Sequence, residues 1–113
     1  MTRVCFRLQV DPRHLDAYRK RHAEVWPAML RAIAAAGRRN YSLFLDDDGL
    51  LIGYYETDSV VDADRALAAS AVASAWERHM QDFFDGLEVR ADQGARILPE
   101  VFNLEDQLAA AAD

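Results

Sequence analysis

Residues 18–27, Tyr-Arg-Lys-Arg-His-Ala-Glu-Val-Trp-Pro, carry both an amphipathic helix and the signal that interrupts it. Tyr18 and His22 are four residues apart, which places them one turn above the other on a single helix face. Pro27 has no N–H and disfavours the α conformation at Trp26, so the helix is predicted to break just before the proline. A phenol, an imidazole and an indole beside a backbone break indicate a small polar pocket. The simpler alternative is that both aromatic residues are core and the histidine is half-buried.

The chain on either side of this stretch has the pattern of one strand followed by two helical segments. Residues 3–10 alternate between apolar and polar side chains, which is typical of a half-buried strand. The dipeptide Asp11-Pro12 then offers an N-cap and a first helical residue. Helix is therefore predicted over residues 12–24 and 27–36, and Gly37 follows as a C-terminal stop.

The rest of the chain continues with a hairpin, a second helical region and a last strand. An Asp-Gly turn at residues 46–49 separates two runs rich in strand-forming residues. Pro99 interrupts the final apolar run, as an edge strand tolerates. The expected elements are strands over 39–46 and 50–57, helices over about 60–70 and 74–85, a loop over 85–95, a strand over 97–104 and a frayed helical tail over 105–113.

The predicted order of elements is β-α-β-β-α-β, which indicates an α+β protein of ferredoxin-like fold with an antiparallel sheet. Residues 1–104 are expected to form this single domain, and residues 105–113 a C-terminal tail. Helices on one face of such a sheet leave the other face uncovered. Because apolar residues on that face need a partner surface, we expect a homodimer in which two sheets close into an α/β barrel.

Composition excludes several classes of function. The 113 residues carry a net charge of −6, which argues against nucleic acid as a partner, since no excess of positive charge exists to displace phosphate counterions. Apolar runs are far shorter than the ~20 residues that span a bilayer, so no membrane partner is expected. The N-terminus lacks the apolar core of a signal peptide, and the single Cys5 can form no internal disulfide. A cytoplasmic location follows.

Few residue combinations in the chain can support chemistry. His14 and His22 lie two turns apart, roughly 12 Å along a helix, which is too far to bind one metal ion together. Cys5 has no basic activator near it in sequence. What remains is a pocket of histidine, tyrosine, asparagine and tryptophan side chains. Such a pocket suits proton transfer on a hydroxyl-rich ligand.

The chain resembles the L-rhamnose mutarotases, small enzymes of the dimeric α/β-barrel superfamily that interconvert sugar anomers. The resemblance covers about residues 3–104 and rests on several motifs that occur in the same order. These motifs are Val10-Asp11-Pro12, Tyr18-Arg-Lys-Arg-His22, Val25-Trp26-Pro27, Gly37, Asn40-Tyr41-Ser42, Leu45-Asp46, Trp76 with Met80, and Glu100-Val101-Phe102.

The resemblance implies an isomerase that opens and recloses the ring of L-rhamnose or a related sugar without a cofactor. His22 matches the histidine assigned as general acid/base. Tyr18 and Tyr41 match two tyrosines that line the sugar pocket, and Trp76 matches the first of two tryptophans that pack against the sugar. The full set of expected substrate-binding residues is Tyr18, Trp26, Asn40, Tyr41, Trp76 and Glu77.

Glu77 departs from the family pattern, which has a second tryptophan at this position. The segment 85–95 also differs from the family's usual Asn-Pro-Asp-Asn segment. A carboxyl that reaches the sugar would accept hydrogen bonds from its hydroxyls and select a more hydroxylated sugar. A carboxyl that points to solvent would leave specificity unchanged. The solvent orientation is favoured, because charged residues are rarely buried without a partner.

Two other functions remain open at this point, because fold alone does not decide activity. Cofactor-free monooxygenases and haem-degrading enzymes use the same dimeric fold, and His22 or His79 could serve as a haem ligand. A non-enzymatic, dimeric ligand-binding module is the second alternative. An absorbance spectrum with and without added haem would separate a haem enzyme from the other two.

Overall fold

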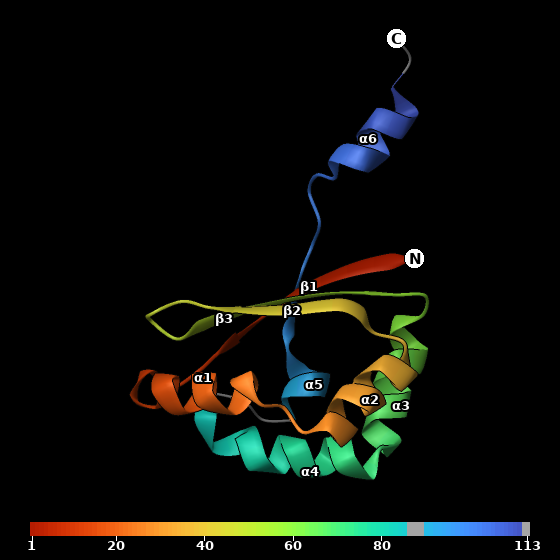
Figure 1. Cartoon of the computed structure of the whole chain (residues 1–113). Coiled ribbons are helices and arrows are strands. Elements are labelled where there is room, and N and C mark those ends of the chain that lie inside the picture. Colours follow the sequence, from red (N-terminus) through yellow and green to blue (C-terminus); the bar gives the residue numbers. More distant parts are fainter. Residues whose placement is uncertain (86–89, 112–113) are drawn as a thin grey trace.

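The computed structural model describes residues 1–85 and 90–111, which form a four-stranded sheet with helices packed against one face (Figure 1). The strands are β1 (Thr2–Gln9), β2 (Arg39–Leu45), β3 (Leu50–Thr57) and β4 (Arg96–Leu98). The helices are α1 (Leu15–Ala23), α2 (Pro27–Ala36), α3 (Val60–Ala69), α4 (Ala71–Met80), α5 (Ala91–Gly94) and α6 (Leu104–Ala110), with short 3-10 turns at Pro12–His14 and Gln81–Phe83.

The sheet has the order β2-β3-β1-β4, and its neighbouring strands run antiparallel. This is the order in which β-α-β-β-α-β units pack, so the predicted α+β, ferredoxin-like class is confirmed. Cys5 lies opposite Tyr54 on β3 and opposite Leu98 on β4, which places these three side chains on one face. That face is the one turned away from α1 to α5 (Figure 1).

The first helical region starts, breaks and ends at the residues that the sequence indicates. The Asp11 side chain accepts a hydrogen bond from the backbone N–H of Arg13, and the first turn is a 3-10 turn before α1 begins. Pro27 is the first residue of α2, after a break between the two helices. Gly37 then adopts a left-handed conformation, with φ of 98°, and its N–H bonds to the Ala34 carbonyl.

The core lies between the inner face of the sheet and the helices. Phe6 of β1, Val10 just after it, Leu51 of β3 and Met80 of α4 are all buried in it. Gly53 faces Phe6 across the β1–β3 pair, and a Cβ on Gly53 would lie only 2.1 Å from the Phe6 ring. The absence of that Cβ lets the end of the Phe6 ring lie against the Gly53 backbone, where the ring forms part of the sheet-side lining described below.

The second helical region differs from the predicted one in its boundaries. Ser70 ends α3 and its hydroxyl accepts a hydrogen bond from the N–H of Ala73, so it also caps α4. The α4 helix therefore begins at Ala71 instead of residue 74, because one N-cap residue replaces the expected joint of several small residues. It ends at Met80, and the polypeptide then runs beside the end of β1, where the N–H of Asp11 bonds to the Phe83 carbonyl.

The predictions for the C-terminal third were partly wrong. The expected loop over 85–95 contains the helical turn α5, and its residues 86–89 lie outside the described residues. The fourth strand stops at Leu98, because Pro99 cannot donate to a neighbouring strand. Beyond it, Val101 is 95% exposed and belongs to no strand.

The segment after β4 extends to the side of the sheet opposite the other helices and carries α6 (Figure 1). Arg3 of β1 anchors this segment to the sheet through ion pairs with Glu100, at 2.8 Å, and with Asp106. In the described ranges, no helix combines the length and apolar character that crossing a membrane requires.

Candidate active site

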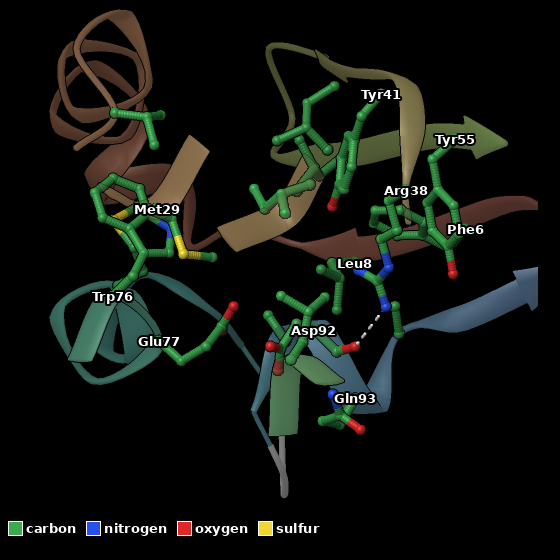
Figure 2. A pocket seen from close by; sticks show the side chains of 18 of the residues that line it. Phe6, Leu8, Met29, Arg38, Tyr41, Tyr55, Trp76, Glu77, Asp92 and Gln93 are labelled. Carbon is green, nitrogen blue, oxygen red and sulfur yellow. Dashed lines mark hydrogen bonds between the residues drawn. The ribbon is translucent and has the colours of Figure 1, made fainter. Parts of the chain in front are cut away.

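A cavity of about 600 Å³ lies between the inner face of the sheet and the helices around it. Its volume falls in the range typical of small-ligand sites. Apolar side chains from β1, α2 and β3 form much of the lining, and polar side chains interrupt it from several elements (Figure 2). The polar residues that line it are Tyr18, His22, Arg38, Tyr41, Tyr55, Asp64, Glu77, Asp92 and Gln93.

His22 lines this cavity from the last turn of α1. Its ring stacks on that of Tyr18 with 4.2 Å between centroids, and it meets the edge of the Trp76 indole at 5.6 Å. Nδ1 lies 3.2 Å from the Tyr18 carbonyl oxygen, and because a carbonyl only accepts, the proton of the neutral ring is on Nδ1. Burial lowers the pKa of His22. The imidazole is therefore neutral near pH 7, and Nε2, which has no hydrogen-bond partner among the described residues, is its available acceptor.

Two tyrosine hydroxyls accompany the histidine in the lining. Burial raises the pKa of Tyr41 to about 12, and burial likewise raises the pKa of Tyr18 well above its ordinary value. Both phenols are consequently protonated at physiological pH and can donate hydrogen bonds to a ligand. The structure thus brings Tyr18, His22 and Tyr41 to one cavity, and their contact with a sugar stays a prediction.

The two tryptophans occupy different places. Trp76 is buried and lines the cavity. Trp26 does not line it: its ring packs edge-on against Trp76 at 5.0 Å and faces His79 at 5.3 Å. The expected contact of Trp26 with the ligand therefore has no support from this cavity, because the Trp26 indole packs against Trp76 instead. Trp26 supports the wall of the cavity from outside.

Asn40 also lies outside the cavity, contrary to expectation. It has a φ of 50°, and the β2–β3 register shifts between Arg39 and Ser42, so the strand is irregular at this point. The Asn40 side chain is exposed and donates a hydrogen bond to Glu56. Glu56 also accepts a hydrogen bond from Tyr54 of the outer face, so this contact places the Asn40 side chain on that face.

Glu77 lines the cavity, so the solvent orientation favoured from the sequence was wrong. Figure 2 shows its side chain extending from α4 into the space in front of α5, whereas Trp76 turns toward Met29. Burial and, as a smaller contribution, the nearby negative charge of Asp92 together raise the pKa of Glu77 to about 7. The nearby positive charge of Arg90 lowers the pKa of Glu77.

Helix spacing could have located Glu77. The buried residues of α4 are Ala73, Trp76 and Met80. Glu77 stands four residues after the first and three residues before the last, and so lies within the same apolar stripe. The rule that charged residues avoid the interior outweighed this spacing in the sequence analysis, although a functional cavity is where that rule is most often broken.

Sequence reasoning missed a group of charged side chains in the lining, the charged wall (Arg38, Asp64 and Asp92). Arg38 forms an ion pair with Asp64 at 2.6 Å and donates to the Asp92 backbone carbonyl at 3.2 Å. Its guanidinium also lies 4.4 Å from the centre of the Tyr55 ring. Asp92 in turn pairs with Arg90 at 2.6 Å. Only the fold brings these residues together, since they come from widely separated segments.

The remaining candidates from the sequence lie elsewhere. His14 packs against Phe83 with 5.4 Å between ring centroids and does not line the cavity. Cys5 is on the outer face of β1. Within residues 1–85 and 90–111, no three histidine, cysteine or acidic side chains group closely enough to hold a metal ion.

The fold and the cavity together define a ferredoxin-like α+β protein with a neutral histidine and protonated tyrosines in a small-ligand site. The sequence model of the L-rhamnose mutarotase family matches residues 3–104, and the chain belongs to this family. The predicted family and enzyme class are therefore confirmed. Mutarotases are isomerases of the racemase and epimerase class.

Individual relatives agree with this assignment. An L-rhamnose mutarotase of Acidiphilium cryptum is 37% identical over 83 residues, which cover 73% of this chain and 79% of the relative. One of Sinorhizobium fredii is 33% identical over 108 residues, covering 92% and 99%. The crystal structure of an L-rhamnose mutarotase from Formosa agariphila has a TM-score of 0.74 at 23% identity and covers 92% of this chain and 99% of that one.

A Mycobacterium tuberculosis protein of known structure has a TM-score of 0.57 at 19% identity, over 90% of this chain and 96% of its own. Its likeness shows that the fold is shared more widely, and it carries no information on activity.

Proposed function

We propose that this protein interconverts the α and β anomers of L-rhamnose or a related sugar by acid/base ring opening in the cavity. The observation that carries the proposal is the environment of His22. Its ring is neutral, lines a sugar-sized cavity and has Nε2 available, while Nδ1 is engaged by the Tyr18 carbonyl. Membership of the mutarotase family supplies the sugar and the reaction.

The reaction needs one base and one acid. His22 Nε2 accepts the proton of the anomeric hydroxyl O1 while an acid protonates the ring oxygen O5. The C1–O5 bond breaks, its electron pair goes to O5, and C1 and O1 become an aldehyde. Rotation about C1–C2 and the reverse proton transfers then give the other anomer. General acid–base catalysis contributes about 10²–10⁴-fold, which suffices for a reaction that also proceeds without an enzyme.

The other lining residues bind and orient the sugar in this proposal. Tyr18 and Tyr41 keep their hydroxyl protons and donate to sugar oxygens. The Trp76 indole packs against the apolar C–H side of the sugar ring. The Trp26 ring in turn packs against the Trp76 indole and holds that indole in place. None of these roles needs a cofactor.

The test is magnetisation exchange between the two anomeric protons, measured by saturation-transfer NMR on L-rhamnose and on a panel of 6-deoxy and ordinary hexoses. The enzyme should accelerate exchange for L-rhamnose and for sugars of the same stereochemistry. A folded protein that accelerates exchange of no sugar on the panel would refute the proposal. The same sample with added haem should show no Soret shift, which separates the mutarotase from the haem-enzyme alternative.

The proposed active form is a homodimer closed through the outer face of the sheet. That face carries Phe44, Ile52 and Tyr54, and Phe44 is 65% exposed in the single chain. The segment after β4 lies on the same side and adds the exposed Val101 and Phe102. Apolar surface of this extent favours coverage by a second copy. We also place the enzyme in the cytoplasm, which the single free cysteine supports.

A further inference from the structure

We propose that Glu77 is the second proton-transfer group of the reaction, exchanging a proton with one sugar oxygen while His22 exchanges one with the other. This inference rests on the proposed mutarotase function and extends it, because ring opening needs an acid as well as a base. Glu77 lies in the buried stripe of α4, one residue after Trp76, and extends into the same cavity that His22 lines (Figure 2).

Glu77 differs from the other two carboxylates of the lining. Asp64 is bound by Arg38 at 2.6 Å, and Asp92 by Arg90 at 2.6 Å. Within the described part of the chain, the Glu77 carboxyl takes part in no ion pair, although it is half-buried. A half-buried carboxyl outside an ion pair and facing a cavity is available to a ligand.

The charged and titratable groups around Glu77 come from three directions. From the α5 side, Asp92 faces it with a negative charge and Arg90 with a positive one; from α1 and β2, the protonated phenols of Tyr18 and Tyr41 face it. Arg38 is the cation of the charged wall, and it is already paired with Asp64. The backbone N–H groups of Ala91 and Asp92 also donate hydrogen bonds to the carboxyl and lower its pKa. Burial outweighs these effects, so the pKa of Glu77 lies at about 7.

Burial therefore moves the two proton-transfer groups in opposite directions. It lowers the pKa of His22 and raises the pKa of Glu77. In the interval between these two values the histidine is neutral and the carboxyl is protonated, so a base and an acid coexist in one site. Titratable pairs whose environments separate their pKa values in this way are characteristic of acid/base catalysis.

The proton transfers of the reaction balance with these two residues alone. In ring opening, O1–H gives its proton to His22 and the Glu77 carboxyl gives its proton to O5 as the C1–O5 bond breaks. The site then holds an imidazolium, a carboxylate and the open-chain aldehyde with a hydroxyl at C5. In reclosure, the C5 hydroxyl attacks C1, its proton returns to Glu77, and O1 takes the proton from His22. Both residues regain their initial protonation states.

The experiment compares Glu77→Gln with the wild type by saturation-transfer NMR on L-rhamnose between pH 5 and 9, after subtraction of the uncatalysed exchange. The wild type should show an acid limb from His22 and a basic limb centred near pH 7 from loss of the Glu77 proton. Glu77→Gln keeps the shape and hydrogen-bonding of the side chain but cannot transfer a proton. Its kcat should fall at least about tenfold with little change in KM, and the basic limb should disappear.

Two further variants complete the design. Glu77→Asp keeps a carboxyl and should retain a basic limb at reduced rate, and it serves as the test if Glu77→Gln does not fold. Glu105→Gln removes an exposed carboxylate of α6 and should match the wild type. A Glu77→Gln protein with a rate within twofold of the wild type, or one that keeps the basic limb, would overturn the inference. An effect on KM alone would reduce Glu77 to a hydroxyl-binding residue and also overturn it. Failure of the wild type to exchange any sugar would instead refute the proposed function.

Discussion

Tyr18 and His22 form one unit on α1: their rings stack at 4.2 Å, and Nδ1 of the imidazole lies 3.2 Å from the Tyr18 carbonyl oxygen. The i, i+4 spacing creates both contacts, because the carbonyl and the side chain of residue i lie below residue i+4. The stacked phenol limits rotation of the imidazole, and the carbonyl selects the tautomer. One helical turn thus prepares a neutral base with its free nitrogen available.

We predict that His22→Asn abolishes most anomer exchange in a folded protein. Asparagine fits the space and keeps a polar side chain, but it cannot accept a proton near neutral pH, so the rate should fall by about 10²-fold or more. His14→Asn is the matched control, because His14 packs against Phe83 away from the cavity. Near-normal exchange by a folded His22→Asn protein would remove His22 from the mechanism.

The raised pKa of Glu77 predicts a pH-dependent gain in stability for Glu77→Gln. The folded state holds the proton up to about pH 7, whereas an unfolded glutamate loses it near 4.5. Between these values the unfolded chain binds fewer protons than the folded one, so wild-type stability falls as the pH rises. Above pH 7, Glu77→Gln should be more stable by up to about 3 kcal/mol.

This difference should shrink as the pH falls through 7 and vanish below about 4.5, where the carboxyl is protonated in both states. Urea unfolding of both proteins at several pH values and one protein concentration measures it. His22 is present in both proteins, so its contribution to the pH dependence of stability cancels in the comparison. A stability difference that is constant with pH, or that grows toward acid, would contradict the environment assigned to Glu77.

Local rules predicted the first half of the fold well. Alternation in residues 3–10 located β1, the Asp11 cap and Pro27 set the starts of the helical segments, and Gly37 set an end. Each of these signals acts over a few residues and needs no tertiary contact. The pairing of Tyr18 with His22 was predictable for the same reason.

The errors arose where distant segments decide the outcome. The irregular start of β2 interrupts the alternation that would have assigned faces to Arg38 and Asn40. The partners of Arg38 come from α3 and α5, which no local pattern connects to it. The apolar run after Pro99 resembled a strand, but its residues are exposed in the single chain. In the proposed dimer, a second copy of the chain would cover these residues.

We predict that Phe44→Glu converts the proposed dimer into a monomer. Phe44 lies opposite Ile52 on the outer face of the sheet, and a carboxylate there would be buried without a partner in the interface. Because the side chain is 65% exposed in the single chain, the fold itself should tolerate the change. Light scattering should report about twice the 12.7 kDa chain mass for the wild type and a single chain mass for the variant.

Val61→Glu is the control for this experiment. Val61 is 63% exposed, nearly the same as Phe44, but it lies on α3 in the helical layer. This variant should remain dimeric. A wild-type protein that is monomeric at micromolar concentration, or a loss of the dimer in both variants alike, would contradict an interface on the outer face of the sheet.

The last prediction concerns the ion pair between Arg38 and Asp64, whose two members differ in exposure. The Arg38 side chain is 4% exposed and that of Asp64 is 38% exposed. Removing the aspartate leaves a guanidinium that is largely buried in the cavity wall without its counter-ion, and its Nε already has no hydrogen-bond partner among the described residues. Removing the arginine leaves a carboxylate that water can solvate. Asp64→Asn should therefore destabilise the protein by about 3 kcal/mol, and Arg38→Met by only about 1 kcal/mol.

Methionine retains most of the apolar contact that the arginine stem makes, so the comparison isolates the charge. Urea unfolding at equal protein concentration measures both values, since dimerisation would otherwise shift the midpoints. The neighbouring pair of Arg39 with Asp58 is the control: its side chains are 51% and 77% exposed, so Asp58→Asn should change stability by no more than about 0.5 kcal/mol. Arg38→Met could instead prove as destabilising as Asp64→Asn. The stability of the charged wall would then depend on packing of the arginine stem against Tyr55 and not on the buried charge.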